Sequence, residues 1–198
     1  MRPRSLNTAM RPEPAPDLSA TVESARAGDQ AAIRALIELY QGRVGRFVLS
    51  MLGDDSEWED VAQVTFVKMI LGIERLQSVD IFESWLFRIA RNSCLDHLRR
   101  LRWRRLFTSW EPRHGEIAAP ARGLQDTRLA QVERALTQLP IDQRELILLM
   151  RENDWSYGDL ARITGVSVVA VKSRLFRART RLRALVRDED ESCNGDES

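Results

Sequence analysis

Three observations predict an all-α fold: two small helical domains joined by a flexible linker. Apolar residues recur at helical spacing on both sides of residues 106–126, whereas strand-like alternation is almost absent. The intervening stretch loses this periodicity and contains Pro112, Gly115, Pro120 and Gly123. The chain has 198 residues, of which 43% are hydrophobic and 30% charged, so it is long enough to bury substantial cores.

The first predicted domain covers residues 27–105 and contains three helices. The first helix follows Asp29, whose carboxylate can cap a helix N-terminus, and it ends at Gly53. The second runs from about 57 to 72, and the third begins near residue 82.

The second predicted domain covers residues 127–187 and ends in a helix-turn-helix pattern. Its predicted helices lie at about 129–139, 142–150, 156–163 and 167–186. Ser156 and Asp159 have the spacing of a capping box at the start of the third of these helices. A short turn containing Gly165 then leads to Ser167, which is placed to cap a long basic helix.

Two terminal segments flank these domains. Residues 1–26 are rich in proline at their start, and we expect a disordered N-terminal extension. Residues 188–198 form an acidic tail.

The charge of the chain is segregated although its net value is only +1. The segment 86–105 holds seven arginines and one acid, Asp96. The segment 166–187 holds six arginines and Lys172 without any acid. Two separate cationic surfaces of this kind favour binding to phosphate backbones.

Several classes of protein are disfavoured by the composition. No apolar run approaches the ~18 residues of a membrane span, and no signal peptide is visible, so we expect a cytoplasmic protein without membrane insertion. Cys94 and Cys193 lack metal-ligand spacing, and the two histidines are His97 and His114. With no P-loop pattern either, we expect no metal, no cofactor and no enzyme activity.

The final helix has two contrasting faces. We expect an inner face of Val168, Val171, Leu175, Ala178 and Leu182. The outer face carries cations, a hydroxyl and an aromatic ring, as a helix that reads the major groove requires. Its members are Lys172, Ser173, Phe176, Arg177 and Thr180, flanked by Arg179 and Arg183. The alternative is an Arg-rich amphipathic helix that only faces solvent.

The third helix of the first domain carries a polar stripe of Arg88, Asn92, Asp96 and Arg99, with Arg91 beside it. Further arginines follow, interleaved with Trp103. Cations, an amide and nearby aromatic rings suit single-stranded or distorted nucleic acid. Trp85 and Cys94, in contrast, fall on the apolar side, where we expect core positions.

Both domains resemble a known family. The segment 82–100, with FESWLFRIARN and LDHLRR, and the upstream EDVAQVTF at 59–66 resemble region 2 of extracytoplasmic-function (ECF) sigma factors, a group of the sigma-70 family. The segment 139–179, including VKSRLFRAR at 171–179, resembles region 4 of the same family. The resemblance covers about residues 27–187, in the expected order and with a linker between the two regions.

This resemblance implies a sigma factor that binds RNA polymerase core, recognises −35 and −10 promoter elements and promotes DNA opening. It also implies control by an anti-sigma factor. For binding to polymerase, it implies Asp60 and Gln63. For the −10 element it implies Arg88, Arg91, Asn92, Asp96, Arg99 and Arg100, and for the −35 element Lys172, Ser173, Arg174, Phe176, Arg177 and Arg179. Val64 departs from the family, which usually has an acid after the glutamine; it either weakens a polar contact or packs against a partner.

Three alternatives stay open at this level. A stand-alone helix-turn-helix regulator would use only the second domain and leave the Arg–Asn stripe unexplained. A sigma-like decoy that titrates an anti-sigma factor would not need the cations of the final helix. A nucleic-acid enzyme would need clustered carboxylates for metal ions, which the sequence lacks.

Overall fold

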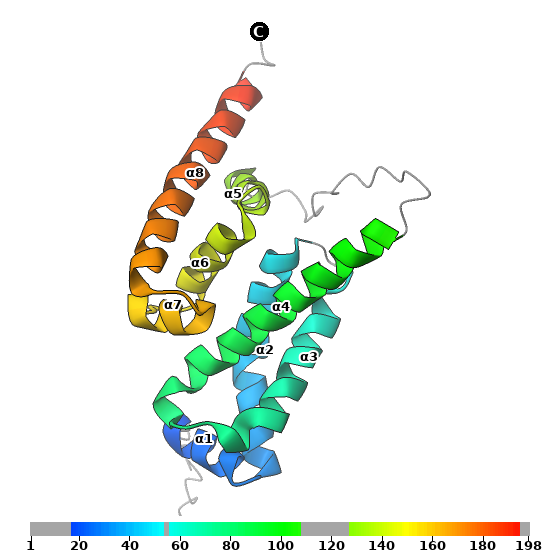
Figure 1. Ribbon diagram of the computed structural model, residues 1–198, viewed down its shortest axis with the longest axis vertical. Helices are drawn as coiled ribbons and strands as arrows, with labels where there is room; N and C mark the ends of the chain where they lie inside the picture. The colour runs from blue at the N-terminus through cyan, green and yellow to red at the C-terminus, as the bar shows by residue number, and fades with distance from the viewer. Residues whose placement is uncertain (1–16, 54–55, 108–126, 195–198) are drawn as a thin grey trace, which may run out of the picture.

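The computed structural model describes residues 17–53, 56–107 and 127–194, and within these ranges the chain forms helices and no strand (Figure 1). This confirms the all-α prediction. The elements are α1 (Leu18–Arg26), α2 (Gln30–Leu52), α3 (Trp58–Gly72), the 3₁₀ turns η1 (Ile73–Arg75) and η2 (Val79–Ile81), α4 (Phe82–Phe107), α5 (Thr127–Thr137), α6 (Ile141–Glu152), α7 (Tyr157–Thr164) and α8 (Val168–Asn194). Most of the predicted linker, residues 108–126, lies outside the described residues.

The first helical layer is a bundle in which α2, α3 and α4 pack against one another, with α1 across one end (Figure 1). Helix α2 begins where predicted, because the Asp29 carboxylate accepts a hydrogen bond of 2.8 Å from the amide of Ala31. It ends at Gly53, which has φ +69°, a left-handed conformation that favours glycine. Its buried face includes Leu36, Tyr40 and Phe47.

Helix α1 differs from the expected disordered extension. Asp17 caps it by accepting a hydrogen bond from Ser19, and Val22 and Ala25 are fully buried against the bundle. The helix contacts α2 and both 3₁₀ turns before α4, so these tertiary contacts account for its formation in a short and weakly apolar segment. Residues 1–16 lie outside the described part of the chain.

The second group of helices, α5 to α8, packs through α6, α7 and α8, and its apolar core is continuous with that of the first bundle. Helices α6 and α7 lie directly against α2 and α4 (Figure 1). Helix α8 extends to Asn194, so the backbone of the predicted acidic tail continues this helix over most of its length.

Cys94 lies in the core, as predicted, with no exposed surface, and its thiol is free. Burial raises the pKa of this thiol to about 12, so it is protonated at pH 8. Because the thiolate is the reactive form, we expect a Cys193→Ser variant to react with a disulfide reagent at pH 8 only after unfolding. Rapid labelling of the native variant would contradict this buried position.

Candidate nucleic-acid interface

The helix-turn-helix forms as the sequence predicts. The amide of Asp159 donates to the Ser156 hydroxyl (3.1 Å), and the amide of Ser156 donates to the Asp159 carboxylate (3.2 Å). The hydrogen bond from the Ser156 hydroxyl lowers the pKa of Asp159 and keeps this capping carboxylate charged. Gly165 has φ +73° in the turn, and the Ser167 hydroxyl accepts from the amide of Ala170 at the start of α8. Local chemistry therefore sets the angle between α7 and α8.

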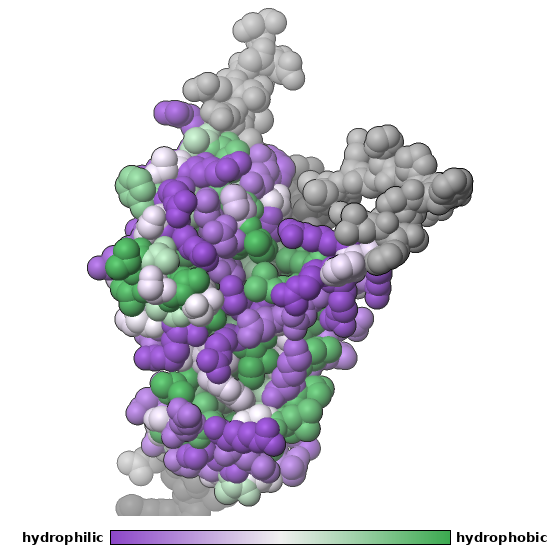
Figure 2. All heavy atoms as spheres, in the orientation of Figure 1, coloured by the Kyte–Doolittle hydropathy of each residue, from purple (hydrophilic) through white to green (hydrophobic). Residues whose placement is uncertain are grey.

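Helix α8 presents its predicted outer face to solvent. Lys172, Ser173 and Arg177 are exposed, and Phe176 is 72% exposed although it is a large apolar residue. Apolar surface gathers where α7 meets the start of α8 (Figure 2). The arrangement provides cations, a hydroxyl and an aromatic ring on one open helix face.

The inner face of α8 is largely as predicted, since Val171, Leu175 and Ala178 are buried. Val168 differs, because it is 39% exposed. As the first residue of the helix, it lies past the edge of the core. Leu182 packs partly buried against the core.

The basic residues of α8 differ in how strongly neighbouring side chains hold them. Lys172 lies over the ring of Tyr157, with 5.4 Å from its Nζ to the ring centroid. Arg174 is half-buried and faces Asp142 of α6 at 3.5 Å. Arg179 is exposed, and its guanidinium approaches the Met150 sulfur at 3.3 Å. Arg174 is therefore the predicted −35 residue most strongly held by its own domain.

The predicted −10 residues lie along α4 but differ in their surroundings. Arg88 and Asn92 are exposed to solvent. Arg91 is half-buried, and its guanidinium donates to Glu145 of α6 and to the side-chain oxygen of Asn92. The other predicted −10 residues, Asp96, Arg99 and Arg100, line a separate pocket.

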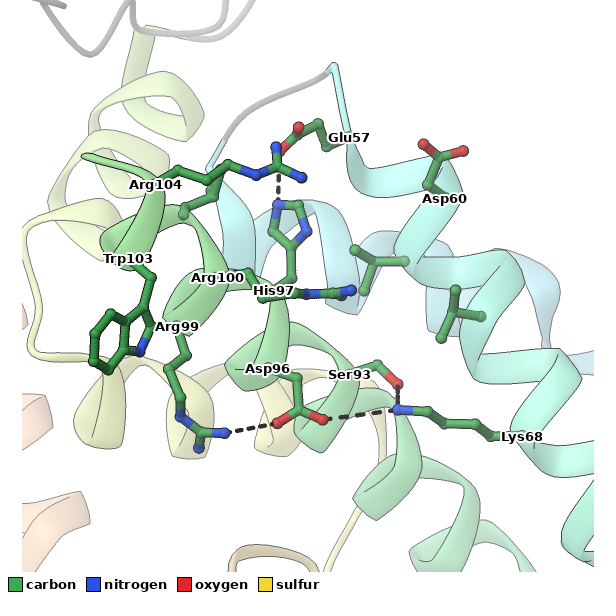
Figure 3. A pocket seen from close by; sticks show the side chains of 13 residues that line it. Glu57, Asp60, Lys68, Ser93, Asp96, His97, Arg99, Arg100, Trp103 and Arg104 are labelled. Atoms are coloured by element: carbon green, nitrogen blue, oxygen red, sulfur yellow. Dashed lines mark hydrogen bonds and ion pairs between the residues drawn. The ribbon is translucent and has the colours of Figure 1, made fainter. Parts of the chain in front are cut away.

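This pocket has a volume of about 620 Å³ and lies between α3 and α4 (Figure 3). Asp96 forms ion pairs with Lys68 of α3 (3.8 Å) and with Arg99 of the stripe (3.0 Å), so it partly neutralises the positive charge of this pocket. Trp103 is 56% exposed and lines the same pocket. The predicted polymerase-binding residue Asp60 also lines it, which brings the two predicted functions onto one surface.

Two contacts at this pocket were not indicated by the sequence. His97 lies 2.7 Å from the Glu57 carboxylate and links α4 to the residue before α3. Lys68 donates to the Ser93 hydroxyl at 3.1 Å. The residues of each pair are at least 25 positions apart, and no motif in the sequence links them.

Helix α3 presents a mixed face on its outer side. Asp60 and Gln63 are both exposed. Beside them runs an exposed apolar strip at helical spacing, made of Val64 (41% exposed), Val67 (53%), Ile70 (39%) and Leu71 (75%). Val64, the departure noted above, is thus the first member of an apolar strip. Such a strip on a helix that already packs its other side into a core is typical of a protein interaction surface.

Two kinds of feature are absent from the ranges that the structure describes. None of the helices there combines the length and apolarity that a membrane span requires. Nor do histidine, cysteine and acidic side chains group there in a way that could hold a metal ion.

Two family models match the chain. Residues 36–104 match sigma-70 region 2, and residues 129–182 match sigma-70, region 4. The first match spans parts of α2 to α4, and the second contains the helix-turn-helix.

Curated relatives match over most of their length. The chain is 35% identical over 177 residues to the ECF RNA polymerase sigma factor SigC of Mycobacterium tuberculosis, covering 87% of this chain and 93% of the relative. It is 33% identical over 170 residues to the RNA polymerase sigma-H factor of Pseudomonas aeruginosa, covering 80% and 88%.

Two solved structures are similar, each at 28% identity. CnrH in complex with the cytosolic domain of CnrY has a TM-score of 0.66, covering 87% of this chain and 99% of that one. The sigma factor RpoE in complex with the anti-sigma factor NepR from Bartonella quintana has a TM-score of 0.67, covering 78% and 96%. With both regions matched in order and with relatives aligned along their length, the chain belongs to the ECF sigma factors of the sigma-70 family.

Proposed function

We propose that this protein is a dissociable promoter-specificity subunit of bacterial RNA polymerase. It binds the core enzyme in the cytoplasm, recognises a −35 and a −10 element, and promotes DNA opening at a dedicated set of promoters. The observation that carries the proposal is the open face of α8: its cations and Phe176 are exposed beside a correctly capped helix-turn-helix, in a chain that also contains region 2. The protein acts by binding and not by catalysis.

The −35 element is read as duplex by α8. In helix-turn-helix proteins the second helix enters the major groove, and its side chains reach the base edges. Lys172, Ser173, Phe176 and Arg177 face outward on α8, with Arg174 and Arg179 at its sides. Arg177 can grip a guanine edge, and Phe176 can contact a thymine methyl group.

Side chains along α4 read the −10 element as the two DNA strands separate. Arg88 and Asn92 are exposed and can hold a base that has left the stack, with Arg91 beside them. Asp96, Arg99 and Arg100 follow along the same helix toward the exposed Trp103. Opening is driven by the free energy of binding to the unpaired strand.

Replacing Asn92 by alanine should impair promoter opening more than binding to closed duplex promoter DNA. The side-chain amide is needed for a flipped base and not for duplex contacts, and Asn92 is exposed, so the fold is kept. Permanganate footprinting measures opening, and a gel shift with holoenzyme measures binding. Equal losses in both assays would argue against base capture.

The exposed face of α3 is the docking surface for the core enzyme. Asp60 and Gln63 supply polar contacts, and the apolar strip beginning at Val64 supplies buried area. The family usually has an acid where this chain has Val64. Because Val64 belongs to the exposed apolar strip, we favour packing of its side chain against the partner.

A variant with both Asp60→Ala and Gln63→Ala should bind core polymerase about 10-fold more weakly. This loss corresponds to about 1.4 kcal/mol for the two truncations together, because most residues of an interface cost less than about 1 kcal/mol each when truncated. Competition with a labelled sigma factor for core enzyme measures this affinity. The matched control is Glu38→Ala with Gln41→Ala, an acid and a glutamine of the same spacing on α2. Unchanged competition by the α3 variant would remove Asp60 and Gln63 from the interface.

An anti-sigma factor is a further proposed partner. The two solved structures described above are complexes, and one of them is named as a sigma factor in complex with an anti-sigma factor. The match covers 99% and 96% of those two chains. The apolar strip of α3 is a surface that such an inhibitor could cover.

Transcription in vitro tests the main proposal. Core bacterial polymerase is supplied with a pool of genomic promoters, with and without the protein. We expect discrete transcripts only when the protein is present, and their upstream sequences will define both elements. Confirmed DNA binding without core enzyme and without transcripts would favour the stand-alone regulator. Absence of both DNA and core binding would favour the decoy.

A further inference from the structure

An apolar side chain at the start of α8 lies open to solvent and belongs to none of the DNA contacts proposed above. Val169, the second residue of the helix, is 76% exposed, the largest value for a large apolar side chain among the described residues. It therefore adds almost nothing to the core. Valine is also a weaker helix former than alanine. Neither packing nor helix propensity accounts for a valine at this position.

Val169 continues the outer face of α8 toward the turn of the helix-turn-helix. At about 100° per residue, seven residues bring the helix back to within about 20° of the same direction, so Val169 and Phe176 point to the same side. Phe176 is also largely exposed. The two residues thus provide two open apolar positions along the middle of this face.

The cations beside these positions are held by neighbouring groups. The Lys172 ammonium lies over the Tyr157 ring of α7, with 5.4 Å from Nζ to the ring centroid. The Arg177 guanidinium folds back along the helix, and its Nε donates to the backbone carbonyl of Ser173 at 3.4 Å. Neither contact covers Val169, whose side chain stays open.

The charge around Val169 favours duplex DNA as the partner of this face. The segment 166–187 has seven cations and no acid, so it attracts a phosphate backbone. In helix-turn-helix proteins, the N-terminal residues of the second helix contact the base edges in the major groove. Val169 lies in this part of α8, so its side chain meets the bases when the helix enters the groove.

A branched apolar side chain has one matching group on the bases of the major groove. Thymine carries a methyl group there, whereas the edges of the other bases present hydrogen-bond donors and acceptors alone. A valine side chain neither donates nor accepts. It gains when it removes the methyl group from water, and it imposes a cost when it removes water from a polar edge.

We propose that Val169 is a specificity-determining residue of the −35 contact and selects a thymine by its methyl group. The inference rests on the proposed function, and it assigns to Val169 a base that neither Phe176 nor the cations of α8 read. Val169 and Phe176 are seven residues apart, or about 10.5 Å along the helix axis, and base pairs are spaced about 3.4 Å apart. The two residues therefore contact different positions, at most about three base pairs apart.

The test removes the methyl group and the valine side chain separately and together. In the promoter of the strongest transcript from the assay above, each thymine of the −35 element, on either strand, is replaced in turn by deoxyuridine, which lacks only the methyl group. Gel shifts measure binding of holoenzyme to each duplex with the wild-type protein, Val169→Ala or Val169→Ile. Alanine removes the branched side chain and favours the helix, whereas isoleucine keeps the branched apolar surface.

Val168→Ala is the matched control, because it makes the same substitution at the preceding residue. Val168 is 39% exposed and lies about 100° around the helix from Val169, on the side of the buried Val171. We expect this variant to respond to each deoxyuridine as the wild type does. Phe176→Ala provides a second comparison on the outer face.

We expect deoxyuridine at one position to weaken wild-type binding about 4-fold, the effect of losing the burial of one methyl group. Val169→Ala should bind the thymine promoter more weakly by a similar factor, and the same deoxyuridine should then have no further effect. Val169→Ile should keep the sensitivity at that position. In Phe176→Ala this position should stay sensitive, and a different position should lose its sensitivity.

Purely additive losses would overturn the proposal: every deoxyuridine would then weaken Val169→Ala as much as the wild type. The same loss of sensitivity in Val168→Ala would also overturn it. Weaker binding of Val169→Ala to core polymerase, with an unchanged deoxyuridine pattern, would assign Val169 to a protein contact instead. If no transcript appears, the proposed function fails and the −35 contact falls with it, whereas transcripts with additive losses overturn the role of Val169 alone.

Discussion

Replacing Phe87 by alanine should lower the free energy of unfolding by about 3–5 kcal/mol, the usual cost of removing a buried phenylalanine. Phe87 has no exposed surface. Its ring meets Phe47 and Trp155 edge-on, each with centroids 5.6 Å apart, and the Arg43 guanidinium lies 5.4 Å from its centre. Truncation leaves a cavity where the two domains join. Urea denaturation followed by circular dichroism measures the change.

The matched control is Phe176→Ala, which makes the same substitution on α8. Phe176 is 72% exposed, so its loss should change the free energy of unfolding by less than about 0.5 kcal/mol. A similar cost at both positions would contradict the burial of Phe87.

A variant with Lys172→Ala and Arg177→Ala should initiate about 100-fold less efficiently from a promoter that depends on its −35 element. Each cation that contacts a base edge typically contributes about 1–3 kcal/mol, and both are exposed on the outer face of α8. The loss should disappear on a template whose −35 element is scrambled. Abortive transcription at limiting holoenzyme, on both templates, measures this difference.

Arg183→Ala with Arg187→Ala is the control for charge alone. Both arginines are exposed further along α8, beyond the residues that match region 4. Removing them should weaken DNA binding on both templates alike, as expected for a sequence-independent electrostatic contribution. If the two double variants behave identically, −35 recognition does not depend on Lys172 and Arg177. Both double variants should bind core polymerase with the affinity of the wild type.

The helix ends follow from the sequence because short-range chemistry defines them. Asp29 and Gly53 limit α2, and the capping box of Ser156 and Asp159 starts α7, each through bonds to its own neighbours. Gly165 takes the left-handed conformation that its turn requires. None of these features needs a partner from elsewhere in the chain.

The exposed faces were predictable for a similar reason. On a helix, residues three and four apart share a face, so the apolar spacing of Val171, Leu175 and Ala178 also defines which side remains open. The same spacing places Phe176 and Arg177 on the outward side without reference to any tertiary contact. Periodicity is a weaker guide at helix ends, because a terminal residue can lie past the edge of the core, as the exposed Val168 does at the start of α8.

Helix α1 shows where local signals become too weak. The buried residues of this helix are Val22 and Ala25. Both are small, and they follow a proline-rich stretch, so the sequence gives little sign of a helix here. A nine-residue helix is marginal on its own and depends on packing against α2 and the turns before α4.

Apart from α1 and the exposed Val168, the sequence alone was sufficient for the helices, their faces and the family, because periodicity, capping and motif order are encoded locally. Only the tertiary structure decided how the two domains meet. Arg91 reads as one more cation of the DNA-binding stripe, and Glu145 as an ordinary acid of an amphipathic helix. Their partnership joins positions 54 residues apart, and the burial of Glu145 exists only after both domains have folded and packed.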